Sequence, residues 1–99
     1  MFLGERMDAS EAARIGLVNL TVVHEELERT TSEWAIKIAN NAPLAIQTAK
    51  KQMRLGLSSD FESNLEFSVL AQRRLFQTND FREGVRSFTE KRDPVFKGE

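Results

Sequence analysis

Cysteine is absent from this 99-residue sequence, which excludes a disulfide framework and thiolate chemistry and fits a reducing compartment. No apolar run approaches the roughly 20 residues that a membrane-spanning helix needs. The N-terminal residues 1–6 lack the apolar core of a signal peptide. We therefore expect a cytoplasmic protein with no membrane partner.

An excess of charge of one sign is also lacking. The chain has 14 basic and 15 acidic residues and a formal net charge of −1, so nothing in its charge points to nucleic acid as a partner. Hydrophobic residues make up 40% and charged residues 29% of the sequence. That balance is typical of a globular protein rather than a disordered one, although so short a chain can bury only a modest core.

The usual signatures of catalytic and metal sites are missing. The five glycines are scattered and form no phosphate-binding loop. The single histidine, His24, has no histidine or cysteine at metal-ligand spacing, so we assign it a surface or capping role. Glu11, Glu62 and Glu83 are explained by helix capping better than by acid–base catalysis, which needs carboxylates that converge in a dry cleft. The sequence therefore predicts no catalytic residue and no metal site.

Helices dominate what the sequence does contain, so the predicted fold class is mainly α. Apolar residues recur at three- and four-residue spacing, and start and stop signals divide the chain into about five helices: 9–15, 25–40, from Pro43 to about Gly56, 60–77, and from Asp80 to Asp93. The β-branched, apolar stretch 17–23 reads as one short extended link.

The helix ends are predicted from capping residues. Three capping boxes are expected to start the first, fourth and fifth helices: Asp8 with Glu11, Ser59 with Glu62, and Asp80 with Glu83. Gly16 is placed to end the first helix, and Pro43 to begin the third. Asp93–Pro94 is expected to end the fifth. The tail 95–99, with an aromatic residue and a lysine close to the terminus, is predicted to dock rather than fray.

The fourth helix has two apolar faces. Phe67 and Leu70 lie nearly opposite a longer stripe at 100° per residue. That stripe consists of Phe61, Leu65, Val69, Gln72 and Phe76. A helix with two apolar faces needs two packing partners. The second partner is either the third helix or a surface outside this chain, such as another subunit or a missing domain.

Positive charge gathers at three places: Lys50-Lys51-Arg54, Arg73-Arg74, and Lys91-Arg92 with Lys97. The first two are read as solvated helix faces or ends. At the third, Lys91 follows Phe88 by three residues, so the two side chains are expected on neighbouring helix positions. An aromatic ring beside an ammonium group can receive a base and a phosphate, although the spacing alone is a weak signal.

Two long motifs carry a family resemblance. Residues 3–19 read LGERMDASEAARIGLVN, and residues 80–98 read DFREGVRSFTEKRDPVFKG. Both resemble recurrent segments of the enoyl-CoA hydratase/isomerase (crotonase) family, as does the stretch 40–45 with Lys50–Lys51 between them. The resemblance covers essentially the whole chain. Leu3 departs from it, because many members carry threonine there.

The resemblance implies that the parent protein acts on acyl-CoA thioesters through an enolate that two backbone N–H groups stabilise in an oxyanion hole. Those donors and the family's catalytic glutamates belong to an upstream ββα core that this chain lacks, so the segment alone is expected to be inactive. The family's C-terminal helices form trimers, often paired as hexamers. The aromatic residue and the lysine of its last helix contact CoA in a neighbouring subunit, and these positions map to Phe88 and Lys91.

We therefore interpret residues 1–99 as one C-terminal helical domain. Residues 1–23 would be a helix and link from the end of the core, and 24–99 an oligomerisation and CoA-covering region. No cofactor is implied, since coenzyme A is part of the substrate. Two alternatives stay open: a free-standing helical oligomerisation or regulatory protein translated from its own Met1, and a parent with dehydratase, thioesterase or dehalogenase chemistry. Acyl-chain specificity cannot be derived from this sequence.

Overall fold

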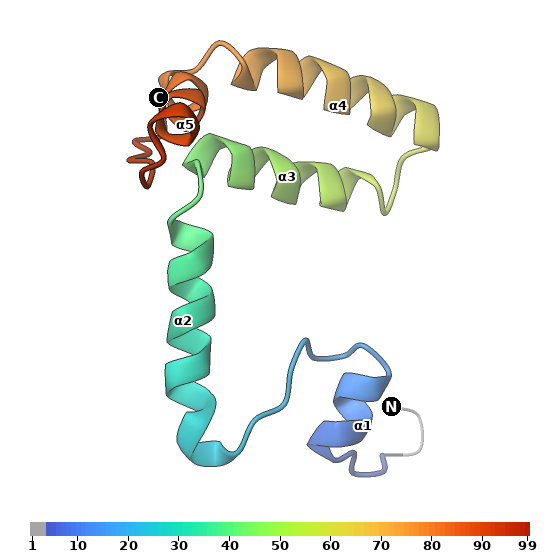
Figure 1. The fold of residues 1–99 in the computed structure, drawn as a ribbon. Coiled ribbons are helices and arrows are strands. Elements are labelled where there is room, and N and C mark those ends of the chain that lie inside the picture. The colour runs from blue at the N-terminus through green and yellow to red at the C-terminus, as the bar shows by residue number, and fades with distance from the viewer. Residues whose placement is uncertain (1–3) are drawn as a thin grey trace. The chain divides into compact units, whose positions relative to one another are not determined.

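The computed structural model describes residues 4–99, so Leu3 and the start of the first motif lie outside the described residues. Helices and connecting segments make up this part of the chain, and no strand occurs between residues 4 and 99 (Figure 1). The elements are α1 (Ala9–Arg14), a 3-10 turn η1 (His24–Glu26), α2 (Leu27–Ala39), α3 (Pro43–Leu55), α4 (Phe61–Leu75) and α5 (Asn79–Glu90). The prediction of a mainly α fold with five helices is confirmed. The chain divides into two compact units, 1–34 and 35–99, which we describe separately.

The first unit begins with α1, which starts and stops where the sequence predicts. The Asp8 carboxylate accepts the backbone N–H of Glu11 at 2.8 Å, which satisfies one of the free donors at the helix start. Glu11 does not complete a capping box, because its carboxylate binds the guanidinium of Arg14 instead. Gly16 ends the helix at φ 75°, and the N–H groups of Gly16 and Leu17 bond back to Ala13 and Ala12. This pair of bonds is a Schellman motif.

The extended link is shorter than predicted. The N–H groups of Leu17 and Val18 still donate to the carbonyl of Ala12, so these residues close the helix end and are not extended. Regular structure is absent between residues 20 and 23, and the turn η1 then leads into α2. The β-branched composition of this stretch favours an extended chain. The hydrogen bonds to Ala12 nevertheless hold Leu17 and Val18 in the turn that closes α1.

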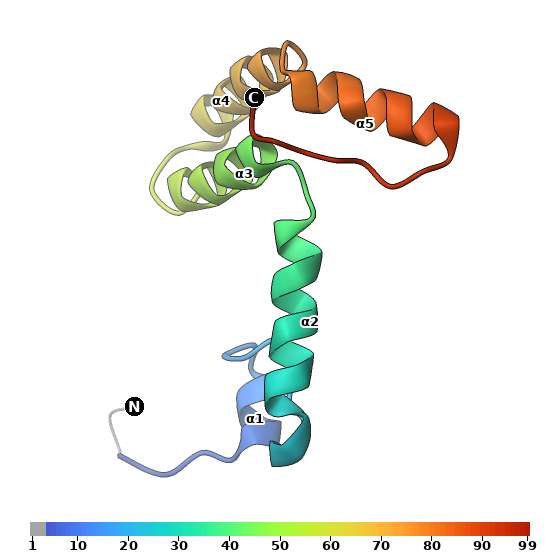
Figure 2. The same cartoon turned by 90° about the vertical axis from the view of Figure 1, so that its left-hand side faces the viewer.

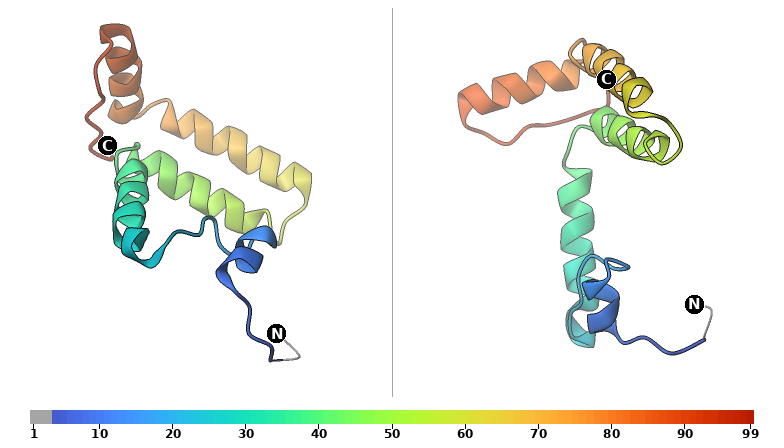
Figure 3. Two further views of the ribbon diagram at one scale, coloured as in Figure 1. Left: turned by 60° about the horizontal axis from the view of Figure 1, so that its bottom comes forward. Right: turned by 90° about the vertical axis from the view of Figure 1, so that its right-hand side faces the viewer.

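Helices α3 and α4 form an antiparallel hairpin in the second unit, and lie side by side in Figures 1 and 3. Pro43 occupies the first turn of α3 as predicted. Across the hairpin, the Gln52 amide donates to the Ser68 hydroxyl, and the Lys51 ammonium lies 5.4 Å from the centre of the Phe67 ring. At the closed end, a Cβ on Gly56 would meet the Asn64 amide at 2.6 Å, so glycine permits the close approach there.

The hairpin gives the second apolar face of α4 a partner only in part. Phe67 is half-buried, and its ring lies beside the Lys51 ammonium of α3, whereas Leu70 is 59% exposed. The opposite stripe stays exposed, with Phe61 79% accessible. The predicted cap at Ser59 is wrong: Asp60 caps α4, and its carboxylate accepts the N–H of Ser63 at 2.8 Å. Both residues can cap a helix, and the one nearer the first helical residue does so.

Helix α5 follows α4, and the C-terminal tail runs back along it (Figure 2). The rings of Phe76 at the end of α4 and Phe81 in α5 have centroids 4.8 Å apart. A Cβ on Gly84 would stand 3.7 Å from the ring of Phe96 in the tail, in ordinary van der Waals contact. The prediction that the tail docks is confirmed.

Within residues 4–99, no apolar side chain is fully buried; the buried residues are Asp80 and Ser87, each 4% exposed. Side chains that would normally form a core are open, among them Leu57 at 89% and Phe88 at 86% exposure. Apolar surface on this scale usually marks a contact with another protein surface. Residues 4–99 alone therefore form no fully buried apolar core.

We predict that the isolated 99-residue chain self-associates. The exposed stripe of α4 removes apolar area from water only when it meets a second surface, at roughly 25 cal/mol per Å². Light scattering over a concentration series should give a mass above that of one chain. Phe61→Glu with Leu65→Glu should lower that mass, and Glu62→Gln on the same helix should not. A well-folded monomer at high concentration would contradict this prediction.

Candidate functional site

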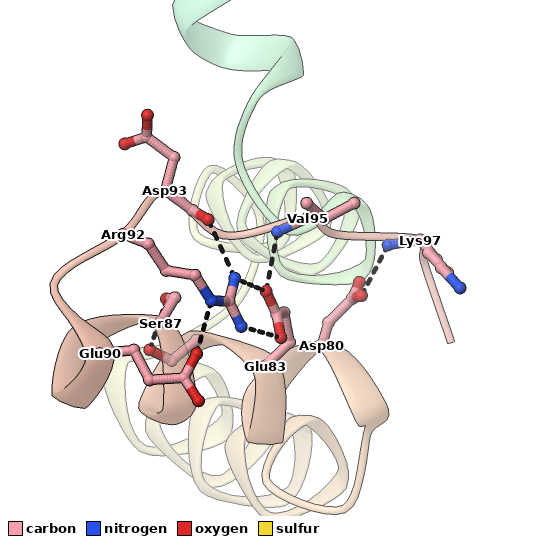
Figure 4. A network of polar contacts seen from close by, with 9 residues as sticks. Asp80, Glu83, Ser87, Glu90, Arg92, Asp93, Val95 and Lys97 are labelled. Atoms are coloured by element: carbon pink, nitrogen blue, oxygen red, sulfur yellow. Dashed lines mark hydrogen bonds and ion pairs between the residues drawn. The ribbon is translucent and has the colours of Figure 1, made fainter.

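A buried carboxylate at the start of α5 holds the C-terminal tail (Figure 4). Asp80 is 4% exposed, and its two oxygens accept the backbone N–H groups of Lys97 at 2.7 Å and Gly98 at 2.8 Å. Its own N–H donates to the carbonyl of Glu99 at 3.0 Å. Asp80 is the second residue of α5, where the positive end of the helix dipole stabilises an anion. The carboxylate is therefore satisfied by backbone donors and the helix end.

One turn further along α5, Glu83 binds Arg92 through two parallel hydrogen bonds of 2.6 and 2.9 Å. Glu83 also accepts the N–H of Val95 at 3.0 Å, and the Arg92 guanidinium donates to Glu90 at 2.6 Å and to the carbonyl of Asp93 at 3.0 Å (Figure 4). The guanidinium of Arg92 and then the N–H of Val95 lower the pKa of Glu83 to about 2. The carboxylates of Glu83 and Glu90 in turn raise the pKa of Arg92. We call Asp80, Glu83 and Arg92 the tail clasp.

The tail clasp corrects the prediction that Asp80 and Glu83 form a capping box. Thr78 caps α5 instead, and its hydroxyl accepts the N–H of Phe81 at 3.1 Å. Thr78 lies nearer the helix start, so Asp80 is already inside the first turn. Nothing in local spacing reveals that Asp80 meets Lys97 and Gly98, which lie 17 and 18 residues away. Sequence reasoning therefore missed the clasp.

Helix α5 also ends earlier than predicted, at Lys91 rather than at Asp93–Pro94. Lys91 has φ 54° and ψ 43°, and is the one non-glycine residue at positive φ between residues 4 and 99. Its N–H bonds to Phe88, and the N–H of Arg92 bonds to Ser87 at 3.1 Å. This is the Schellman pair seen at Gly16, with lysine in the position that glycine normally takes. Lysine there is strained, since its Cβ crowds the backbone.

The structure keeps Phe88 and Lys91 at one end of α5, although Lys91 has left the helix. The N–H of Lys91 donates to the carbonyl of Phe88 at 3.3 Å. Phe88 is 86% exposed, so it is not a core residue of this chain. It lines a hollow of 540 Å³ whose other aromatic walls are Phe76, Phe81 and Phe96. The ammonium of Lys91 makes no ion pair within residues 4–99.

The other residues singled out in the sequence lie in a turn or at helix ends and form no part of the tail clasp. His24 is exposed in the turn η1, Glu62 lies in the first turn of α4, and Arg73 and Arg74 lie in its last turn. The described residues contain no group of three histidine, cysteine or acidic side chains that could hold a metal ion. None of the helices found between residues 4 and 99 has the length and apolar character needed to cross a membrane.

We predict that acid breaks the attachment of the tail to Glu83 at an unusually low pH. The pKa of Glu83 falls from an ordinary 4.5 to about 2 in the folded chain, so the carboxylate stabilises the docked tail fully above pH 4.5 and loses this effect as the pH falls toward 2. The amide shift of Val95, followed by NMR, should titrate with a midpoint near the pKa of Glu83. In Arg92→Gln the midpoint should rise toward 4.5. Equal midpoints in the two proteins would refute this assignment.

Comparison with known proteins gives consistent matches over the whole chain. Residues 1–99 match the family model described as enoyl-CoA hydratase/isomerase. The chain is 39% identical over 98 residues to a probable mitochondrial enoyl-CoA hydratase 2 of Arabidopsis thaliana, covering 99% of this chain and 33% of that protein. It is also 38% identical over 99 residues to a carnitinyl-CoA dehydratase of Salmonella typhimurium, covering 96% of this chain and 38% of that protein.

Among solved structures, an enoyl-CoA hydratase from Bacillus anthracis matches with a TM-score of 0.94 and 38% identity. The match covers 99% of this chain and 38% of that chain. The helices described above therefore occur as one part of a larger known fold. The chain spans 33–38% of the length of these three relatives.

Proposed function

Because the chain belongs to the enoyl-CoA hydratase/isomerase family, we propose that it forms the C-terminal helical part of an enzyme acting on acyl-CoA thioesters. The reaction would add water across a double bond conjugated to the thioester or shift that bond. Backbone N–H groups outside this chain would stabilise the thioester enolate. The chain itself would oligomerise and cover the acyl-CoA pocket, with Phe88 and Lys91 touching CoA in a neighbouring subunit.

One observation carries the oligomerisation and covering roles: no apolar side chain within residues 4–99 is fully buried. The exposed stripe of α4 and the hollow beside Phe88 are surfaces that a core domain and neighbouring subunits would cover. A trimer, or a hexamer of paired trimers, would bury these surfaces. Obligate interfaces are hydrophobic in the same way and resemble the core of a single domain. The exposure of these faces supports this assignment.

The proposed contact with CoA is supported by the exposure of two side chains at the end of α5 and by the lack of an ion pair at one of them. The ring of Phe88 is 86% exposed and can stack on a flat base. Lys91 is exposed, without an ion pair within the described residues. An ammonium group forms charge-assisted hydrogen bonds to phosphate oxygens. Together the two groups suit the nucleotide end of CoA, which combines an adenine ring with phosphates.

We predict that the isolated chain does not hydrate crotonyl-CoA, because the proposed oxyanion-hole donors lie outside this chain and its sequence offers no paired catalytic carboxylates. Asp80 and Glu83 are occupied by the tail and by Arg92. The assay follows the loss of absorbance of the conjugated thioester. The whole enzyme that contains these residues should turn over the same substrate. Turnover by the isolated chain that survives repurification would contradict this prediction, and an inactive whole enzyme would count against the proposed chemistry.

A second chemistry has support of its own. The carnitinyl-CoA dehydratase is 38% identical to this chain, nearly the same as the 39% of the Arabidopsis hydratase, so the helical part does not separate hydration from dehydration. Hydration and dehydration are the two directions of one reaction, so the acyl group and not the direction separates the two relatives. Initial rates of the whole enzyme with a simple 3-hydroxyacyl-CoA and with carnitinyl-CoA, which also carries a trimethylammonium group, distinguish the two substrate classes. A free-standing oligomerisation or regulatory protein predicts no turnover of either substrate by any protein that contains this sequence.

A further inference from the structure

The left-handed backbone of Lys91 is held from both sides. Before it, α5 ends with the Schellman bonds to Phe88 and Ser87. After it, the Arg92 side chain folds back onto the helix and binds Glu90 at 2.6 Å. The ion pair between Glu90 and Arg92 therefore spans Lys91, so rotation of the Lys91 backbone would break it.

The Arg92 guanidinium is itself fixed by a second helix position. Glu83 binds it through both carboxylate oxygens, at 2.6 and 2.9 Å, and the side chain of Glu83 is only 19% exposed. A bidentate pair between a guanidinium and a carboxylate fixes direction as well as distance. The two terminal nitrogens of the Arg92 guanidinium bind Glu83 and its Nε binds Glu90. The Arg92 side chain therefore has little freedom to rotate.

The two carboxylates that hold Arg92 are occupied by it, while Lys91 makes no ion pair within residues 4–99, neither with them nor with the exposed Asp93. Glu83 and Glu90 are both paired with Arg92, so neither is left to draw the Lys91 ammonium back to the helix. A strained backbone persists only where its surroundings determine it. The arrangement keeps the lysine available to an anion from outside.

We propose that Arg92, anchored by Glu83, is a positioning residue that holds Lys91 in the conformation in which it meets a phosphate group of CoA. This proposal rests on the proposed function of Lys91. It assigns Arg92 no contact with the substrate. Its effect passes entirely through the Lys91 backbone.

Steady-state kinetics of the whole enzyme test the proposal with two substrates, an acyl-CoA ester and the matching acyl-pantetheine ester, which lacks the nucleotide. Arg92→Lys keeps the positive charge but loses the planar guanidinium that binds Glu83 through two nitrogens. We expect it to raise KM for the CoA ester about five- to tenfold, below the roughly ten- to hundredfold effect of losing one charged hydrogen bond outright. The KM for the pantetheine ester and both kcat values should stay unchanged. Arg86→Lys, on the exposed side of α5, is the matched control and should change neither KM.

A double-mutant cycle separates positioning from general structural damage. In a Lys91→Ala background, Arg92→Lys should add no further increase in KM, because the residue through which Arg92 acts is gone. Equal effects on the two substrates, or additive effects in the double variant, would overturn the positioning role. An unchanged KM in Lys91→Ala alone would instead refute the proposed contact between Lys91 and CoA, so the two failures are distinguishable. Glu83→Gln keeps the shape of the side chain, and should reproduce the Arg92→Lys pattern if the anchor is needed.

Discussion

In the whole enzyme, Lys91→Ala is expected to raise KM for an acyl-CoA ester about ten- to hundredfold, since a hydrogen bond to a charged group contributes roughly 1.5–3 kcal/mol. The kcat should stay nearly unchanged, because the nucleotide end of CoA is bound alike in the ground state and the transition state. Steady-state kinetics with the CoA ester measure both values. Lys50→Ala, at an exposed position of α3, is the matched control.

The left-handed backbone at position 91 makes alanine the suitable probe. Alanine and lysine both carry a Cβ, so the strain at φ 54° stays about the same and only the ammonium group is removed. Glycine would also relieve the strain and mix two effects. The acyl-pantetheine ester completes the design, because it cannot reach Lys91 through a phosphate. If Lys91→Ala weakens binding of both esters equally, the lysine has a structural role and the assignment is wrong.

The second large effect is expected at Asp80. Asp80→Ala removes the acceptor of two backbone N–H groups, from Lys97 and Gly98, and should lower the free energy of unfolding by about 3–6 kcal/mol, as expected for two hydrogen bonds to a charged group. Urea unfolding of the whole enzyme measures the loss. Hydrogen exchange at Lys97 and Gly98 should accelerate at the same time, because the tail loses its attachment.

Two variants control this experiment. Asp80→Asn keeps one carbonyl acceptor and should show about half the effect of alanine, since one N–H still finds a partner. Asp93→Asn removes a carboxylate from an exposed position next to the tail and should leave both exchange rates unchanged. Slow exchange at Lys97 and Gly98 in Asp80→Ala would show that the tail is held by other contacts.

Local signals predicted the helices well. The Asp8 cap, the Gly16 stop and the Pro43 start each depend on residues within five positions of one another, and the structure has all three. Such features follow from backbone hydrogen bonding at helix ends. The errors arose where several residues compete for one role. Asp60 caps α4 in place of Ser59, and Thr78 caps α5 in place of Asp80.

The tail clasp could not be predicted from the sequence for a different reason. Glu83 and Arg92 are nine residues apart, and Asp80 and Gly98 eighteen, so these contacts depend on the chain turning back after α5. That turn depends in part on the left-handed conformation of Lys91, and lysine gives no sequence signal for it. A glycine at position 91 would have predicted the end of α5 from the sequence, as Gly16 does for α1. Phe88 and Lys91 were singled out first by their three-residue spacing and then by the family resemblance, and their contact with CoA remains a prediction.

Under the proposed contact between Lys91 and CoA, the strained lysine at the end of α5 sets thermal stability against substrate affinity. A lysine in the left-handed region costs about 1–2 kcal/mol relative to an unstrained residue, and at Gly16 the same chain avoids this strain in an equivalent turn. Laboratory evolution for heat resistance alone would therefore favour glycine at position 91 and discard the ammonium group. Selection for growth at low acyl-CoA concentrations would restore the lysine. A more robust enzyme that keeps its affinity for CoA should therefore be sought through changes at other positions.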